Sequence, residues 1–224
     1  AAEHGTTGDT LQILREPRTA PEQRMNMIID ALPSSVRVAG ALHPVRTDFR
    51  IYMMLEQLIA DEEISKEERV LHALELVYDD LDAIDAADFD DAVAAMLWFY
   101  RCGKPEDKRL TKRAEARREK GIEPERVYDF DQDAEYIYAA FLEQYGVDLC
   151  DADLHWWKFH AMLHALREDC LFVKIMGYRS ADLNKIKDKK EKNRIAQLKA
   201  LYKLRNGMSE EEKAAALYDP TGTD

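Results

Sequence analysis

The spacing of large apolar residues from residue 48 onward constrains the fold more than any other feature of this sequence. Ile51, Leu55 and Leu58 recur at intervals of three and four. Thr47 or Asp48, just before them, can cap a helix. Three later segments repeat the pattern: Val70, Leu74 and Val77; Phe89, Val93, Met96 and Tyr100; and Ala134, Ile137, Phe141 and Tyr145. This spacing places apolar side chains on one stripe of an α-helix, so the chain is predicted to be mainly α.

Local signals mark where these helices begin and end. Ser65 and Glu68 have the spacing of a capping box, in which each side chain bonds the backbone N–H of the other residue. Gly103 and Gly146 follow two of the stripes and are expected to end them. Further helices are predicted for residues 171–176, for about 182–204 and after Ser209.

One segment before the helices has the pattern of strands. β-branched residues flank Pro33, Ser34 and Ser35, and a second turn signal lies at Ala39 and Gly40. A small β-hairpin is therefore predicted over residues 35–44. The expected fold class is mainly α, a helical domain with a small N-terminal β-hairpin.

Composition divides the chain into four parts. Residues 1–24 are rich in Gly, Thr, Pro and Arg and are interpreted as a leader or linker, which a cloning remnant, a processed end or an upstream reading frame would each explain. Residues 25–103 hold the hairpin and acidic helices. Residues 104–126 are predicted to be a charged linker, and residues 127–224 a C-terminal helical part with aromatic and basic segments.

The charge of the chain is segregated. Its net charge is -12, yet residues 61–91 are strongly acidic while 104–120 and 185–205 are basic. These segments can pair within one fold or between copies in an assembly. An acidic chain is not expected to bind nucleic acid, although the basic segment at 185–203 leaves that alternative open.

Other bulk properties predict a soluble protein of a reducing cytosol. The three cysteines lie far apart and form no CxxC pair, which argues against both a disulfide framework and a zinc ribbon. No apolar run approaches the roughly 18 residues that a membrane span needs. No membrane association is therefore expected.

A doubled tryptophan is the most informative aromatic feature. Trp156 lies on the apolar stripe of a helix that Asp151 or Asp153 is expected to cap. Trp157 lies off that stripe, which indicates either a partner surface or a second packing layer. The predicted partner-binding residues are Trp157, Tyr178, Arg179, Trp98 and Tyr100.

Signals for chemistry are weak. His160, His164 and Glu168 have metal-ligand spacing if one helix carries all three, but no further ligand pair accompanies them. The Asp-x-Asp-x-Asp run at 129–133 lacks the later glycine and glutamate of a calcium loop, so capping by Asp129 or Asp131 is the favoured reading. There is no phosphate loop or nucleophile elbow. No enzyme activity, metal or cofactor is predicted.

Four blocks in the same order carry a resemblance to a known family. They are residues 97–104, 128–141, 154–159 and 172–189. Together they look like the bacteriophage gene-product-fifteen family of siphophages and prophages of Gram-positive bacteria, over about residues 25–216. The resemblance implies a tail-region protein encoded beside the tape-measure gene.

That resemblance implies a non-catalytic tail assembly chaperone. Such a protein would bind the tape-measure protein and help to recruit tail-tube protein subunits, in the host cytoplasm during phage assembly. A homo-oligomer is a further expected assembly. An exposed apolar tape-measure helix suits a groove lined with aromatic residues and Met. The alternative is a structural component of the mature phage tail or its terminus.

Overall fold

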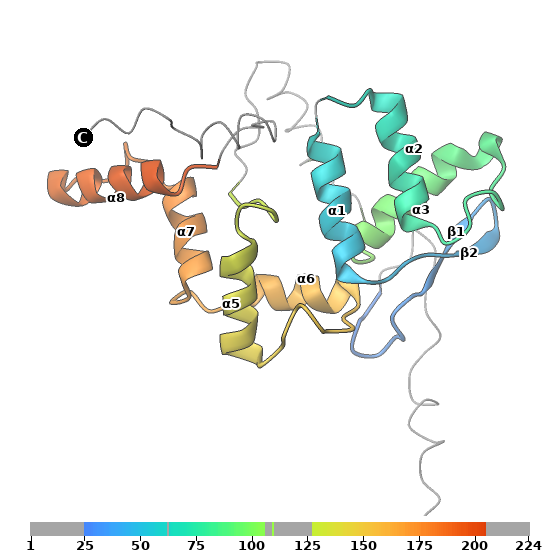
Figure 1. Ribbon diagram of the computed structural model, residues 1–224, viewed down its shortest axis with the longest axis horizontal. Coiled ribbons are helices and arrows are strands. Elements are labelled where there is room, and N and C mark those ends of the chain that lie inside the picture. Colours follow the sequence, from blue (N-terminus) through green and yellow to red (C-terminus); the bar gives the residue numbers. More distant parts are fainter. Residues whose placement is uncertain (1–24, 62, 106–108, 110–126, 205–224) are drawn as a thin grey trace, which may run out of the picture. The chain divides into compact units, whose positions relative to one another are not determined.

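The computed structural model describes residues 25–61, 63–105, 109 and 127–204. The described elements are mainly α-helical with one small antiparallel sheet, which confirms the predicted fold class (Figure 1). In chain order they are β1 (Ser35–Val38), β2 (Ala41–Pro44), α1 (Phe49–Ala60), α2 (Lys66–Val77), the 3-10 helix η2 (Ala86–Asp88), α3 (Phe89–Tyr100), α5 (Ala134–Tyr145), α6 (Trp156–His164), α7 (Leu171–Ser180) and α8 (Lys189–Leu201). The predicted leader, most of the predicted linker and the helix expected after Ser209 lie outside the described residues.

The hairpin forms where the sequence predicts it. Ser35 pairs with Pro44 and Val38 with Ala41, so the two-residue turn is Ala39 and Gly40. Both turn residues have positive φ, 46° and 88°, as tight hairpin turns that follow the twist of the strands require. Alternation along β1 buries its valines against the rest of the fold.

The chain divides into two compact units that do not follow sequence order. Unit 1 comprises Ala1–Pro124 and Asp151–Ala165, and unit 2 comprises Glu125–Cys150 and Leu166–Asp224. The hairpin, α1, α2, α3 and α6 therefore belong to unit 1, whereas α5, α7 and α8 belong to unit 2. Residues 127–224 are predicted from the sequence to form one C-terminal part, whereas α6 within that range belongs to unit 1 with the N-terminal helices.

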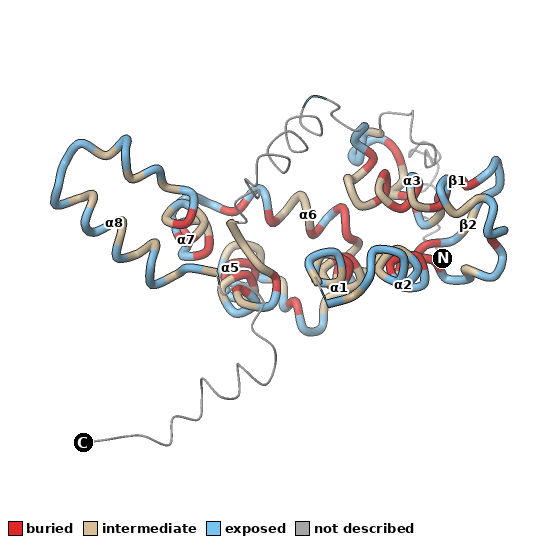
Figure 2. The backbone as a smooth tube through the Cα atoms, turned by 90° about the horizontal axis from the view of Figure 1, so that it is seen from above, coloured by how far each residue is buried: buried red, intermediate tan, exposed pale blue. Residues whose placement is uncertain are grey.

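The core of unit 1 takes only part of the predicted stripes: Leu55 and Leu74 are buried, whereas the buried Tyr52, Trp98 and Phe99 lie off them (Figure 2). Its fully buried large side chains are Tyr52, Leu55, Leu74, Tyr78, Trp98, Phe99, Trp156 and Phe159. The segment before α6 is held by the backbone, because Phe49 N donates to Leu154 O at 3.1 Å and Trp156 N donates to Thr47 O at 2.7 Å. These bonds explain why residues distant in sequence share one unit.

Two of the three predicted caps in unit 1 are confirmed. Asp48 accepts a hydrogen bond from the backbone of Arg50 and caps α1, and Ser65 with Glu68 forms the complete capping box of α2. The prediction for α6 is wrong, because its N-cap is His155 instead of Asp151 or Asp153. Backbone pairing of this segment with the start of α1 sets where α6 begins, and the residue at that point is a histidine.

Unit 2 is smaller and less deeply packed. Ile137 and Phe141 of α5 are buried, as are Phe172 and Ile175 of α7, but α8 buries none of its side chains. α8 is also shorter than predicted. The Asp188 carboxylate accepts from Glu191 N at 2.7 Å and starts the helix there, so the preceding residues from 182 form turns.

Candidate functional site

Trp156 and Trp157 insert both indole rings against the end of α3. The Nε1–H of Trp156 donates to Tyr100 O and that of Trp157 to Phe99 O, both at 2.8 Å. Adjacent residues on a helix point about 100° apart, yet both rings reach neighbouring carbonyls of the same helix end. The last carbonyls of a helix lack intrahelical partners, and the two indoles donate to two of them; Phe99 O also accepts from Cys102 N at 2.9 Å.

Other rings complete this cluster in unit 1. Tyr52 stacks on Trp156 with ring centroids 5.2 Å apart, and Trp98 meets Trp157 edge-on at 5.7 Å. Trp98 is fully buried, and its Nε1 has no hydrogen-bond partner within the described part of the chain. The cluster is therefore predominantly a packing arrangement, with aromatic faces and edges in the offset geometries that rings prefer.

Gly103 lets α3 end directly against Trp157. Its φ is +69°, a left-handed conformation, and a Cβ built on it would lie 2.7 Å from Cη2 of the indole. Gly103 N donates to Trp98 O at 3.0 Å, which closes the helix end. The glycine is required both for the backbone angle and for the approach of the ring.

The structure places three of the four predicted aromatic residues within this cluster. Trp157 is 2% exposed and Trp98 is fully buried, so Trp157 forms the second packing layer that the sequence left open as an alternative. Tyr100 is half-buried; its ring stacks on Trp156 and its hydroxyl donates to Glu56 Oε1 at 2.7 Å. Their role in partner binding stays a prediction, and of the three only Tyr100 has substantial surface.

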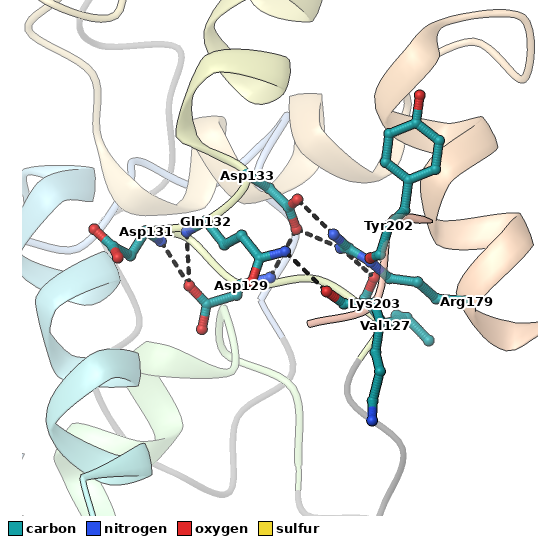
Figure 3. Close-up of polar contacts among 8 residues, drawn as sticks. All are labelled: Val127, Asp129, Asp131, Gln132, Asp133, Arg179, Tyr202 and Lys203. Atoms are coloured by element: carbon teal, nitrogen blue, oxygen red, sulfur yellow. Dashed lines mark hydrogen bonds and ion pairs between the residues drawn. The ribbon is translucent and has the colours of Figure 1, made fainter. Parts of the chain in front are cut away.

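Arg179, another predicted contact residue, is buried in unit 2 (Figure 3). Its guanidinium donates to both carboxylate oxygens of Asp133, to Tyr202 O at 2.6 Å and to Val127 O at 3.1 Å. One side chain on α7 thus joins the start of α5 to the backbone just before α5 and to the backbone just after α8. Tyr178, next to it, is half-buried and stacks on Tyr202 with centroids 6.2 Å apart.

The Asp-x-Asp-x-Asp run forms the turn that leads into α5. Asp129 Oδ1 accepts from the backbone N–H groups of Asp131 and Gln132, both at 2.9 Å, and so closes this turn. The N-cap of α5 is Asp133, so the prediction that Asp129 or Asp131 caps the helix is wrong. Gln132 Nε2 donates to Lys203 O at 3.2 Å. Sequence reasoning missed Asp133. Its only signal was a third aspartate at a helix start, and nothing local indicated a buried partner 46 residues away.

His160, His164 and Glu168 do not lie together on one helix. α6 ends at His164, and the chain then passes into unit 2, so Glu168 is not on the same helix. Among the described residues, no group of three or more His, Cys, Asp or Glu side chains is placed to hold a metal ion. The two histidines do lie close together, with their Nε2 atoms 3.2 Å apart.

Some large apolar side chains remain exposed. In unit 1 they lie before the hairpin, on β2 and on the outer faces of α1 and α2, and in unit 2 on three helices. They are Met27, Ile28, Ile29, Leu42, Met54, Ile59 and Leu71 in unit 1, and Leu142, Leu171 and Leu201 in unit 2. None of the described helices combines the length and apolarity that crossing a bilayer requires.

The fold and its clusters define a helical protein with a small hairpin, in which aromatic rings and a buried ion pair organise two units. The chain matches the family described as Bacteriophage Gp15 protein over residues 28–204, and it belongs to that family. The family resemblance predicted from the four sequence blocks is confirmed at this level. No curated protein and no solved structure matches the chain. Membership indicates a structural or assembly role in a bacteriophage.

Proposed function

We propose that this protein is a phage tail assembly chaperone that binds the tape-measure protein and helps to recruit tail-tube subunits, without catalysis, in the host cytoplasm. The observation that supports the proposal, beyond family membership, is the composition of α1. Only Arg50, Glu56 and Gln57 are polar among its twelve residues, yet its buried side chains are just Phe49, Tyr52 and Leu55. A helix that is apolar on most sides is normally enclosed, and this one is not.

The uncovered part of α1 has the chemistry of a helix-binding surface. Met54 is 44% exposed and Ile59 45%, while Ile51 and Leu58 on the same side as Met54 are half-buried. Methionine adapts its shape to irregular apolar partners at little cost. An apolar helix laid along the side of Met54 would bury Met54, Ile51 and Leu58, as in other helix-in-groove interfaces. Ile59, five residues after Met54, lies about 140° around the helix, on the side of Leu55.

α2 carries a further exposed apolar side chain. α1 and α2 lie side by side (Figure 1, Figure 2), and Leu71 on α2 is 41% exposed. Arg69 fixes the connection between them by donating to Ile59 O at 3.3 Å and to Ile64 O at 2.9 Å. Met54, Ile59 and Leu71 are the large apolar side chains of α1 and α2 that are exposed.

Acidic residues surround these side chains and favour a partner with cationic flanks. Glu63, Glu67, Glu68 and Glu75 are all exposed on α2 or just before it. Charges at the edge of an interface steer association and select among partners more than they add affinity. A tape-measure helix with Lys or Arg beside its apolar stripe would fit best.

Co-expression tests the proposal. Overlapping tape-measure fragments, each produced with and without this protein, should become soluble and co-purify with it when they carry the recognised helix. Met54→Ser and Leu71→Ser should weaken capture, because each removes exposed apolar surface without opening the core. Leu201→Ser, at an exposed leucine of α8, is the matched control and should leave capture unchanged. Fragments that stay insoluble, or equal capture by all variants, would refute the proposal.

Mass spectrometry of purified virions separates a chaperone from a component of the mature tail. A chaperone should be absent from finished particles. Stoichiometric recovery from the tail or its terminus would replace the chaperone with the structural alternative.

A further inference from the structure

His160 and His164 occupy one side of α6, four residues apart and therefore one turn apart. Their ring centroids are 4.3 Å apart and their Nε2 atoms 3.2 Å apart, so the two distal nitrogens converge on one point. His164 is exposed and His160 is half-buried. Solvent thus reaches this point from the outer side.

We propose that His160 and His164 form a two-histidine site for a divalent transition metal ion, with water completing the coordination. A metal bound at the usual 2.0–2.1 Å from both nitrogens would subtend an angle of about 100° at the observed separation. That angle lies between the 90° or so of adjacent octahedral ligands and the 109° or so of tetrahedral ones. Imidazole nitrogens suit Cu²⁺, Ni²⁺ and Zn²⁺.

One of the two donors is held in place by the aromatic cluster. The ring of His160 meets Trp156 edge-on with centroids 5.5 Å apart. Trp156 is itself fixed by its hydrogen bond to Tyr100 O and by stacking on Tyr52. A ligand whose orientation is set before the ion arrives loses less conformational freedom on binding.

Nearby charges both favour and oppose the binding of a cation at the two histidines. His164 lies in the last turn of α6, where unpaired carbonyls place partial negative charge that favours a cation. Burial, the neighbouring His164 and Lys104 lower the pKa of His160 to about 4, and burial and Lys104 also lower the pKa of His164. The charge of Lys104 itself opposes an incoming cation.

The competing description is a hydrogen-bonded imidazole pair with no ion. One Nε2 would then carry a proton and donate it to the other at 3.2 Å, and the tautomers would differ between the two rings. The two descriptions make opposite predictions for metal titration.

Calorimetric titration of the tag-free full chain with Cu²⁺ and with Zn²⁺ at pH 7 distinguishes them. The variants are His160→Ala and His164→Ala, with His72→Ala as the control because His72 is exposed on α2. Each ligand variant should weaken binding by at least about tenfold, whereas His72→Ala should not change it. Lys104→Ala should tighten binding. Electron paramagnetic resonance of the Cu²⁺ complex should show two nitrogen ligands, and one or none in the ligand variants.

Unchanged Cu²⁺ affinity in both ligand variants, or an equal loss in His72→Ala, would overturn the proposal. Thermal melting without metal keeps the test valid, since His164 is outside the core and its variant should unfold at the wild-type temperature. If His160→Ala perturbs Trp156 and melts early, His164→Ala alone decides the outcome.

Discussion

Arg179 on α7 donates to both carboxylate oxygens of Asp133 at the start of α5, at 2.5 and 2.8 Å, and both side chains are almost completely buried. Asp133 Oδ2 also accepts from Asp129 N at 3.0 Å. The same guanidinium donates to backbone carbonyls before α5 and after α8. The pair is therefore the polar centre of unit 2, with the donors and acceptors of both members engaged.

Asp133→Ala should destabilise unit 2 severely. It leaves a buried guanidinium without its counter-charge, which typically costs about 3–5 kcal/mol. Hydrogen exchange of the α5 amides across a urea series measures the loss. Glu191→Ala breaks the exposed Glu191–Arg194 pair in the same unit and should change exchange far less. Equal effects of the two variants would mean that the buried Asp133–Arg179 pair stabilises unit 2 no more than an exposed ion pair does.

Gly103→Ala should destabilise unit 1 more than Gly146→Ala destabilises unit 2. Both glycines have nearly the same φ, +69° and +66°, so both variants carry a left-handed strain of about 1–2 kcal/mol. Only at Gly103 does the new Cβ collide with an indole ring, because space around Gly146 is open. Urea unfolding compares them. All three tryptophans lie in unit 1, so their fluorescence reports on that unit, and hydrogen exchange of the α5 amides across the urea series reports on unit 2. Similar losses would place Trp157 farther from Gly103 than described.

The cap of α6 should make unit 1 sensitive to acid. His155 Nδ1 accepts from Trp157 N at 3.0 Å, so its proton is on Nε2, which lies 3.0 Å from Pro33 O. Burial lowers the pKa of His155, with a smaller contribution from Lys158. A lowered pKa in the folded state means that the stabilisation is complete above the unfolded value of about 6.5 and declines as the pH falls below it.

His155→Asn tests this dependence, because asparagine caps helices but does not titrate. The urea midpoint of the wild type, followed by tryptophan fluorescence, should fall more between pH 7 and pH 5 than that of the variant. His160 and His164 titrate in both proteins, so the difference between the two profiles belongs to His155. Parallel profiles would refute the assignment.

Trp157→Ala should impair folding at least as much as partner binding. The ring is buried and its Nε1–H donates to the Phe99 carbonyl, so truncation leaves a cavity and removes this hydrogen bond, at a cost of about 3–5 kcal/mol. Melting temperature and tape-measure capture, measured on the same preparation, separate the two effects. Met54→Ser should show the opposite balance. A Trp157→Ala variant with normal melting and lost capture would restore the ring to a binding role.

Features set by neighbouring residues were predictable from the sequence. The hairpin occupies Ser35–Val38 and Ala41–Pro44 as expected, because positive φ at a two-residue turn leaves few alternatives. The capping box at Ser65 and the left-handed end at Gly146 were likewise read from a few adjacent residues. Family membership followed from the order of whole blocks.

Features set by distant residues were not predictable in this way. Helical spacing identifies one apolar stripe, but it cannot show that a second side, carrying Trp157, is also covered by the end of α3. Arg179 has the sequence signature of a surface cation, and only the position of Asp133 makes burial possible. Glu168 failed as a ligand because α6 is one turn shorter than the apolar pattern suggested.

The return of the chain to unit 1 at residues 151–165 has a consequence for biosynthesis. During translation, Tyr52 and Phe99 emerge from the ribosome long before Trp156 is available to cover them. A nascent chain halted near residue 150 would therefore expose these aromatic side chains to chaperones and proteases of the host. Separate expression of N-terminal and C-terminal halves would fail for the same reason.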